Sequence, residues 1–337
     1  MKAVICSEPG RLELIDTPAP GALRPGEIRL RISHVGICGT DYHIFEGKHP
    51  FLEYPRIMGH EISAYVAEAS PASALMAGDL VIVNPYLSCG TCIACRRGKP
   101  NCCMHIKVLG VHTDGAFCEE IAIPEANAYP AGNLRPEQAA TVEFLAIGAH
   151  AVRRSGPGDG SRALVIGAGP IGLGTALFAR IAGYEVTIMD VSAERLAVSR
   201  DRFGFESSLL AGDEALAGGM AFTGNDGFDS VFDATGNARS MNAALPFVAH
   251  GGALVFVSVV KDDITFTDPE FHKREMSIIG SRNALKADFL HVAASIASSA
   301  IDTSKLITHN TSLAGSVTDL PRWAHAKEGL IKAVIAV

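Results

Sequence analysis

The order of hydrophobic and polar positions divides the chain into two parts with different patterns. Up to about residue 145, short apolar runs are cut by Gly and Pro, which predicts the strands of a partly open barrel with long loops. From about residue 161, strand-length apolar runs alternate with helix-length segments, which predicts a parallel sheet covered by helices on both faces. After about residue 282 the pattern is mixed, and it ends in the strand-like residues 331–337.

These runs give the expected elements. In the first part, strands are expected at residues 2–6, 27–35, 62–68, 79–84 and 119–123. In the second part, strands are expected at residues 163–166, 186–189, 229–234 and 253–258, and helices at residues 170–182, 193–203 and 239–248. The sequence therefore predicts an α/β protein whose second part is a doubly wound parallel sheet.

Length and charge narrow the class of protein. A chain of 337 residues with 48% hydrophobic and 19% charged content has the size of about two domains. The formal net charge of -7 gives no excess of positive charge of the kind that binds polyanions. Neither nucleic acid nor an anionic membrane is therefore an expected partner. Residues 1–6 are strand-like and no apolar run reaches about 18 residues, so we expect a cytoplasmic protein.

A glycine-rich turn directly follows the expected strand at residues 163–166 and opens a helix. Its sequence is Gly167-Ala168-Gly169-Pro170-Ile171-Gly172, the Gly-x-Gly-x-x-Gly pattern of dinucleotide-binding sites. Gly167 permits a tight turn, Gly169 lets the backbone approach a pyrophosphate, and Gly172 allows close packing of helix and strand. The free N–H groups of the helix N-terminus favour phosphate binding.

Asp190 ends the next expected strand, about 20 residues further on. A carboxylate at this point accepts hydrogen bonds from the adenosine ribose and repels a 2′-phosphate, which favours NAD over NADP. Arg195 lies close enough in the sequence to accommodate a 2′-phosphate instead, so the preference stays open. The alternative for Asp190 is a solvated acid at a strand end or the N-cap of the following helix.

Five of the eight cysteines lie between positions 89 and 103, which indicates metal binding in a reducing compartment rather than a disulfide framework. Four thiolates at this spacing close a tetrahedron around Zn²⁺ and leave no position open for chemistry. We therefore expect a structural zinc lobe at about residues 86–108, with Cys102 as an alternative fourth ligand. The expected ligands are Cys89, Cys92, Cys95 and Cys103.

Several segments together resemble the zinc-dependent medium-chain alcohol dehydrogenases, in particular their sorbitol and threonine dehydrogenase branch. They are Val-Gly-Ile-Cys-Gly-Thr-Asp-Tyr-His at 35–43, Met-Gly-His-Glu at 58–61, the four cysteines and the glycine turn, in the family's order over nearly the whole chain. Within this branch, residues 142–146, 268–273 and 280–283 resemble enzymes that oxidise sugar acids such as L-galactonate, L-gulonate or L-idonate at carbon 5. Family spacing favours Cys103 over Cys102.

The resemblance implies an architecture for the whole chain. Residues 1–145 would form a GroES-like β-barrel catalytic domain, residues 146–282 a Rossmann NAD-binding domain, and residues 283–337 a C-terminal return to the catalytic domain. The active site is expected between the two domains. Family members assemble as homodimers or homotetramers, and two zinc ions and one NAD are expected per subunit.

The resemblance also implies a catalytic zinc site. Cys38 and His60 would be ligands, and Glu143 would stand where related alcohol dehydrogenases use a cysteine. Glu61 would lie behind His60, so whether Glu61 or Glu143 completes the resting site is open. One thiolate, one imidazole and one carboxylate leave a fourth position for substrate. The alternative for Glu143 is an ordinary acid in the first turn of a helix.

The same resemblance assigns a proton relay. The metal is expected to act as a Lewis acid on the alcohol oxygen, so that hydride passes to C4 of the nicotinamide. Thr40 would accept the substrate proton and His43 would pass it to water. Asp41 would fix the zinc-binding imidazole.

The substrate is the least defined part of this prediction. Arg282 is the candidate contact for a substrate carboxylate, because a planar guanidinium suits bidentate recognition. The alternatives are a neutral polyol dehydrogenase, an L-threonine 3-dehydrogenase and a non-catalytic nucleotide-binding zinc protein. The presence of Cys38, Thr40 and His60 speaks against the last of these, because a mere binder needs no open metal position.

Overall fold

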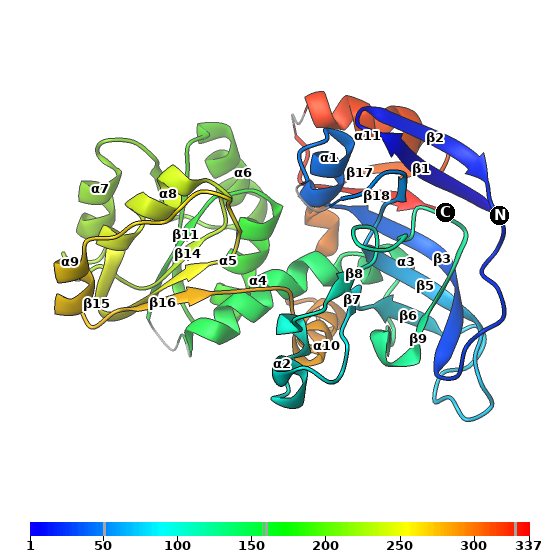
Figure 1. The fold of residues 1–337 in the computed structure, drawn as a ribbon. Helices are drawn as coiled ribbons and strands as arrows, with labels where there is room; N and C mark the ends of the chain where they lie inside the picture. The colour runs from blue at the N-terminus through cyan, green and yellow to red at the C-terminus, as the bar shows by residue number, and fades with distance from the viewer. Residues whose placement is uncertain (50–51, 157, 159–160, 327–328) are drawn as a thin grey trace. The chain divides into compact units, whose positions relative to one another are not determined.

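The computed structural model describes residues 1–49, 52–156, 158, 161–326 and 329–337, which fall into two units (Figure 1). The first unit contains Met1–Glu143 and Leu285–Val337, and the second contains Phe144–Ala284. The second unit is therefore inserted in the chain of the first, and the C-terminal segment returns to the first unit.

Two sheets form most of the first unit. The larger has seven strands, in the order β10-β6-β5-β3-β18-β17, with β9 also paired to β3. Its strands are β3 (Glu27–Ile37), β5 (Glu61–Glu68), β6 (Leu80–Val83), β9 (Glu120–Pro124), β10 (Ala128–Pro130), β17 (Ile307–Ser312) and β18 (Lys332–Ala336). The smaller, of order β2-β1-β4, contains β1 (Lys2–Glu8), β2 (Arg11–Asp16) and β4 (Arg56–Ile57). The five strands predicted in this part of the chain are confirmed as β1, β3, β5, β6 and β9.

The long strand β3 is central to the larger sheet. Its 11 residues pair with β9, β5 and β18, all antiparallel. Near its end, Gly36 lies opposite Glu61 of β5 on one side and Val334 of β18 on the other. Strand β3 therefore places the start of β5 and the start of the C-terminal strand on its two sides.

Helices and an apolar core complete the first unit. The helices outside the cysteine lobe are α1 (Gly39–Phe45), α3 (Pro136–Ala139), α10 (Lys286–Ala297) and α11 (Ser316–His325). The core between the strands includes Met58 and Phe117, which have no exposed surface, and Trp323 of α11. Burial of these large side chains provides the main driving force for folding of the unit.

The second unit is a doubly wound parallel sheet, as predicted. Its strand order is β13-β12-β11-β14-β15-β16, and every neighbouring pair is parallel. The strands are β11 (Arg162–Ile166), β12 (Glu185–Asp190), β13 (Ser208–Leu210), β14 (Phe228–Asp233), β15 (Val248–Phe256) and β16 (Ser277–Gly280). The helices are α4 (Val142–Ser155), whose first two residues belong to the first unit, α5 (Pro170–Ile181), α6 (Ala193–Phe203), α7 (Ala215–Phe222), α8 (Ala238–Ala243) and α9 (Asp268–Lys273).

The strand order of this sheet reverses beside β11. From β11 the chain first adds β12 and β13 on one side and later β14, β15 and β16 on the other. In doubly wound sheets, ligands bind beyond the carboxyl ends of the strands at such a reversal. The glycine turn at residues 167–172 directly follows β11 and therefore lies at this position.

One predicted helix is wrong in length. Residues 239–248 were expected to be helical throughout, but α8 ends at Ala243, a 3₁₀ turn covers Leu245–Phe247, and β15 begins at Val248. Pro246 explains the break, because proline has no N–H to donate and its ring clashes with the preceding helical turn.

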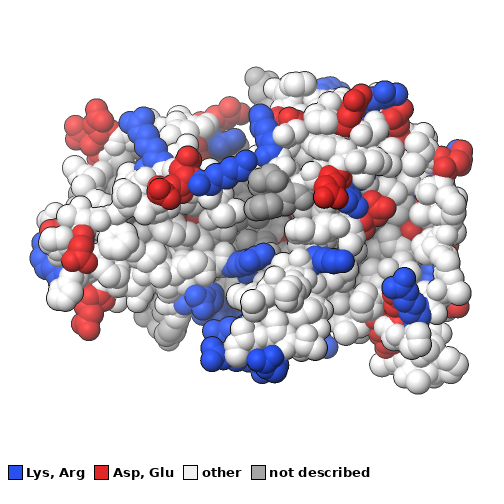
Figure 2. Space-filling model, viewed as in Figure 1, with Lys and Arg blue, Asp and Glu red and all other residues white. Residues whose placement is uncertain are grey.

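Charged side chains are present on both units. On the face shown in Figure 2, acidic and basic residues both occur in each of them. Within the described part of the chain, no helix combines the length and apolar character that crossing a membrane requires.

Candidate metal centres and nucleotide-binding turn

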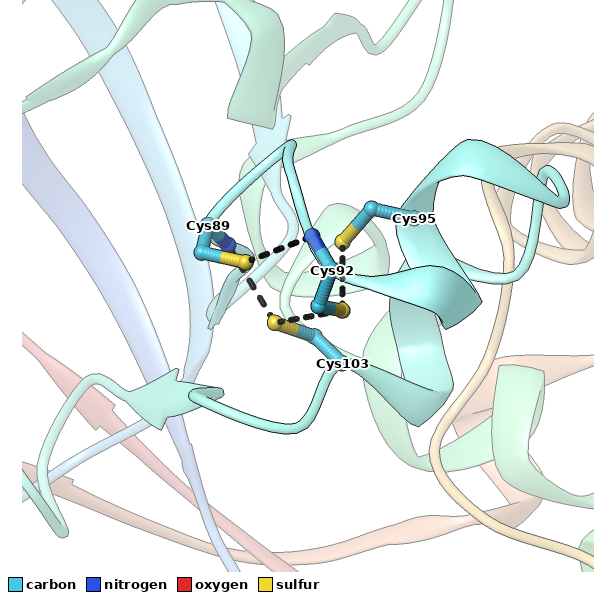
Figure 3. Close-up of side chains that lie close together, drawn as sticks. All are labelled: Cys89, Cys92, Cys95 and Cys103. Carbon is cyan, nitrogen blue, oxygen red and sulfur yellow. Dashed lines mark hydrogen bonds between the residues drawn. The ribbon is translucent and has the colours of Figure 1, made fainter.

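The four cysteines predicted to bind zinc converge in one lobe of the first unit. The lobe contains the two-stranded sheet of β7 (Tyr86–Leu87) and β8 (Lys107–Val108), helix α2 (Ile93–Arg96) and a 3₁₀ turn at Pro100–Cys102. The four sulfur atoms all lie within 4.8 Å of one another, and Figure 3 shows them facing a common centre. Cys102 is exposed and does not belong to this group.

Backbone N–H groups stabilise sulfur anions in this lobe. The Cys103 sulfur accepts from the Cys89 N–H at 3.2 Å, and the Cys89 sulfur accepts from the Cys92 N–H at 3.4 Å. Backbone N–H groups of Thr91 and Cys92 lower the pKa of Cys89 to about 5, whereas burial and the neighbouring sulfurs raise the pKa of Cys95 to about 11. Thiols this close do not all ionise without a shared cation, so the cluster fits Zn²⁺.

The lobe has little apolar core of its own. Helix α2 is only four residues long and contains no buried residue, and Ile93 on it is 43% exposed. Since burial provides so little stabilisation here, a shared metal ion is the interaction expected to order the segment. The donor set of four sulfurs suits a structural rather than a catalytic role.

A second cluster lies where β3 and β5 meet. Cys38 is the N-cap of α1 directly after β3, while His60 precedes β5 and Glu61 is its first residue. The ligand atoms of Cys38, His60 and Glu61 lie within 4.8 Å of one another. His60 and Glu61 are buried, and Cys38 is half-buried. The antiparallel register, with Gly36 opposite Glu61, is what brings these distant positions together.

Asp41 connects the two segments that carry this cluster. Its Oδ2 accepts the Cys38 N–H at 2.9 Å, and its Oδ1 accepts the Gly59 N–H at 3.3 Å. The same Oδ1 lies 3.8 Å from Nδ1 of His60, which is longer than a hydrogen bond. Within the described residues, this buried nitrogen has no hydrogen-bond partner. An imidazole beside a carboxylate, with its other nitrogen directed elsewhere, fits a metal ligand.

Glu143 is held beside this cluster by a residue that the sequence did not point to. It lies in the first turn of α4, is 4% exposed, and accepts a hydrogen bond from the hydroxyl of Tyr86 in β7. Burial raises the pKa of Glu143 to about 7, against the opposing effect of His60. Glu143 is an acid in the first turn of a helix, as its alternative interpretation has it, but it is buried. The only sequence feature that points to Tyr86 is weak: its side chain ends in a hydroxyl, and its neighbour in the two-residue strand β7, Leu87, is apolar.

The buried charges in this region are unbalanced. The carboxylates of Asp41, Glu61 and Glu143 are all buried. The buried Lys332 donates a hydrogen bond to one of them, the carboxylate of Glu61. Burial lowers the pKa of His60, but Asp41 and Cys38 outweigh it and hold that pKa well above the usual value. Uncompensated buried carboxylates are costly, so the region favours a cation. Sulfur, imidazole nitrogen and carboxylate oxygen are donors that Zn²⁺ binds.

The predicted relay residues share one short helix. Thr40 lies in the first turn of α1, and its hydroxyl oxygen accepts a hydrogen bond from the thiol of Cys38, with a sulfur–oxygen distance of 3.8 Å. His43 lies three residues further on, on the same side of the helix, and is exposed. The arrangement places a hydroxyl beside the cluster and an imidazole at the surface. Their roles in proton transfer remain a prediction.

The glycine turn has the geometry that its pattern predicts. Gly167 has a φ of +101°, a conformation that other residues rarely adopt. A Cβ on Gly172 would lie 1.6 Å from the carbonyl oxygen of Gly167, whereas one on Gly169 would meet no atom within 4 Å. Helix α5 begins at Pro170, with Ile171 in its first turn. The backbone beside Gly169 is therefore open to a ligand at a helix N-terminus.

Asp190 connects the glycine turn to the next strand. It is 5% exposed at the end of β12, and its Oδ2 accepts the Ala168 N–H at 2.7 Å. Its Oδ1 accepts the Ser192 N–H at 2.8 Å, while Ser192 itself is the N-cap of α6. Arg195 approaches Oδ2 to 3.9 Å with a side chain that is 54% exposed. Asp190 is thus neither a solvated acid nor the helix cap.

Arg282 is the predicted contact for a substrate carboxylate. It is exposed and follows β16 by two residues, on the carboxyl side of the sheet in the second unit. Cys38 belongs to the first unit and Arg282 to the second. A contact of Arg282 with a substrate therefore remains a prediction.

Comparison with known proteins identifies the family. Residues 24–133 match the family model of the alcohol dehydrogenase GroES-like domain, and residues 170–298 match that of zinc-binding dehydrogenases. L-galactonate-5-dehydrogenase of Escherichia coli K12 is 39% identical, with 99% of this chain and 98% of the relative covered. D-altritol 5-dehydrogenase of Agrobacterium fabrum is 35% identical, with 84% of each chain covered.

A solved structure agrees with this assignment over the full length. The rspB alcohol dehydrogenase of Escherichia coli CFT073, complexed with NADH, superposes with a TM-score of 0.93 at 26% identity, and 100% of this chain and 99% of that chain are covered. The family models, the relatives and the fold lead to one conclusion. This chain belongs to the zinc-dependent medium-chain alcohol dehydrogenases, oxidoreductases that act on CH–OH groups.

Proposed function

We propose that this protein is a zinc-dependent, NAD-linked dehydrogenase that oxidises a secondary alcohol of a sugar acid, such as L-galactonate or L-gulonate at C5, to a keto acid. The observation that carries the proposal is the cluster of the half-buried Cys38 with the buried His60 and Glu61, and Glu143 near it. The similarity to L-galactonate-5-dehydrogenase supports the class of substrate.

Each residue of the cluster has a distinct task in this proposal. Cys38, His60 and Glu143 would hold Zn²⁺, which supplies Lewis-acid chemistry by lowering the pKa of an alcohol hydroxyl. Asp41 keeps the backbone of Cys38 and the segment before His60 in place. Thr40 would receive the hydroxyl proton of the substrate as it gives up its own, and the exposed His43 would pass a proton on to water through the cofactor ribose. The bound NAD would supply the acceptor for the carbinol hydride.

The second candidate function is a neutral polyol dehydrogenase. The similarity to D-altritol 5-dehydrogenase favours it, because an alditol carries no carboxylate. Both candidates use the same metal and cofactor, so the distinction depends on whether Arg282 contacts a carboxylate. A guanidinium forms a bidentate pair with a carboxylate but only single hydrogen bonds with a hydroxyl.

The substrate test compares L-galactonate, L-gulonate and L-idonate with their matching alditols and with L-threonine, before and after chelation. We expect the best aldonate to exceed its alditol in kcat/KM and chelation to abolish turnover. Replacing Arg282 by Gln should raise KM for the aldonate about tenfold, since a hydrogen bond to a charged group contributes about 1.5–3 kcal/mol. KM for the alditol should rise less, because Arg282 makes only single hydrogen bonds with a hydroxyl. Faster turnover of the alditol by the unmodified enzyme supports the second candidate instead.

The cofactor preference is tested at Asp190. We expect Asp190→Asn to raise kcat/KM with NADP relative to NAD by at least about tenfold, because like-charge repulsion of a 2′-phosphate costs several kcal/mol. Asparagine keeps one oxygen acceptor for the Ala168 N–H, so the turn should persist. Arg195→Gln is the matched variant and should shift the ratio in the opposite direction. If the ratio of kcat/KM with NADP to that with NAD is unchanged in both variants, Asp190 and Arg195 do not determine the cofactor preference.

A further inference from the structure

Lys332 is a buried lysine whose ammonium is occupied by one carboxylate. Its Nζ donates to Oε1 and Oε2 of Glu61 at 2.7 and 2.8 Å, and to the carbonyl oxygen of Ile37 at 3.1 Å. The side chains of Lys332 and Glu61 are 2% and 0% exposed. A buried ion pair of this geometry is far less screened by solvent than a surface pair.

The sheet brings the two partners together across an intervening strand. Lys332 begins β18 and Glu61 begins β5, and β3 lies between these strands. The ion pair forms where β3 carries Gly36. A Cβ at this position would lie 2.1 Å from Oε2 of Glu61. The missing side chain therefore leaves the space that the Glu61 carboxylate occupies.

Glu61 belongs to two groups at the same time. One of its oxygens lies within 4.8 Å of the ligand atoms of Cys38 and His60, while both oxygens accept from Lys332. A carboxylate that becomes a metal ligand gives up part of its interaction with an ammonium. Lys332 and a bound cation therefore compete for the same side chain.

We propose that Lys332 is a positioning residue that holds Glu61 in the ion pair and so prevents it from becoming a permanent ligand of the catalytic zinc. Glu143 then supplies the carboxylate ligand, and one position stays open for the substrate. This inference rests on the proposed function, because it presupposes a metal ion bound by Cys38 and His60.

The test uses the full-length protein with zinc in the cysteine lobe and Co²⁺ at the second site. The coordination number of cobalt is read from its visible absorption, because four-coordinate Co²⁺ absorbs much more strongly than five-coordinate Co²⁺. In Lys332→Met we expect the visible bands to weaken as Glu61 binds the metal. Cobalt release to a chelator should slow about tenfold, and kcat should fall about 10- to 100-fold.

Three further variants keep the inference falsifiable if Lys332→Met folds poorly. Lys332→Arg retains the charge and should keep the wild-type spectrum. Gly36→Ala leaves Lys332 in place but displaces the Glu61 carboxylate, and it should reproduce the weakened bands. Lys332→Met combined with Glu61→Gln removes both charges and should restore strong absorption, because position 61 then has no carboxylate to add to that of Glu143. The exposed Lys305 provides a matched control, and Lys305→Met should change neither spectrum nor kcat.

The outcomes separate the inference from the proposed function. If wild-type protein binds cobalt with a sulfur charge-transfer band that Cys38→Ser removes, the metal site exists. An unchanged spectrum and release rate in both Lys332→Met and Gly36→Ala then overturn the role of Lys332 alone. If wild-type protein binds no cobalt that depends on Cys38, the proposed function itself is wrong.

Discussion

Cys38→Ser is expected to lower kcat/KM by about 10³-fold or more, with the fold and the zinc of the cysteine lobe retained. The half-buried thiol lies in one cluster with the buried His60 and Glu61, and the region carries more carboxylate charge than its lysine balances. A Lewis acid contributes several kcal/mol to stabilisation of the transition state, and each 1.36 kcal/mol changes the rate tenfold. Serine is a much poorer zinc ligand than cysteine, so the metal and its contribution should be lost together.

Steady-state kinetics and metal analysis of the same preparation check this prediction. The variant should contain about one zinc per chain where the wild type contains about two. Cys6→Ala is a suitable control, because Cys6 is a buried core cysteine of the same unit outside both clusters, and the control should keep both zinc ions and the wild-type kcat. A Cys38→Ser protein with normal turnover would mean that the reaction does not use this cluster.

Much of the fold follows from local sequence patterns. Strand runs such as residues 2–6 and 163–166 have the period and length of buried strands, and the structure contains them as β1 and β11. The sheet topology of the second unit follows from alternating strands and helices, since parallel neighbours need crossover connections. The helix expected at residues 239–248 ends early, because Pro246 interrupts a segment whose apolar positions by themselves favour a helix.

The candidate sites differ in how far the sequence alone could define them. The lobe cysteines span 15 positions, and Cys-x-x-Cys spacing by itself predicts a shared metal. Cys38 and His60 came only from resemblance to a family, because their proximity depends on the register of β3 and β5. Lys332 has no local signal beyond being a lone lysine in an apolar strand. Its partner Glu61 lies 271 positions away.

The two buried glutamates show why the question of the third ligand stayed open. Glu61 and Glu143 are both buried carboxylates near the same imidazole, and sequence gives no basis for choosing between them. In the structure each carboxylate accepts a hydrogen bond from a different donor. The donor is the Lys332 ammonium for Glu61 and the Tyr86 hydroxyl for Glu143. An ammonium is a charged competitor for a carboxylate, whereas a phenol leaves a second oxygen free to bind a cation.

Cys103→Ser should release the zinc of the lobe and unfold that segment, whereas Cys102→Ser should leave both unchanged. The pair is closely matched, because the two cysteines are adjacent and differ in whether the sulfur faces the cluster. Structural zinc sites have apparent binding free energies of about 10–16 kcal/mol in small peptides. Losing even about 3 kcal/mol of this would raise the population of the open lobe more than 100-fold. The helix of the lobe, without buried residues, offers little to offset the loss.

Limited proteolysis and zinc content measure this effect. In Cys103→Ser we expect new cleavage within residues 86–108 and the loss of one zinc per chain, while Cys102→Ser should be cut at the wild-type rate. Some activity should be lost, because Tyr86 begins the lobe and contacts Glu143. The loss should be smaller than the loss of zinc, because Cys38 and His60 are positioned by β3 and β5, outside the lobe. If zinc is instead lost from Cys102→Ser, the ligand set is wrong by one residue. If both variants keep their zinc, three thiolates suffice to bind it and the fourth cysteine is not required.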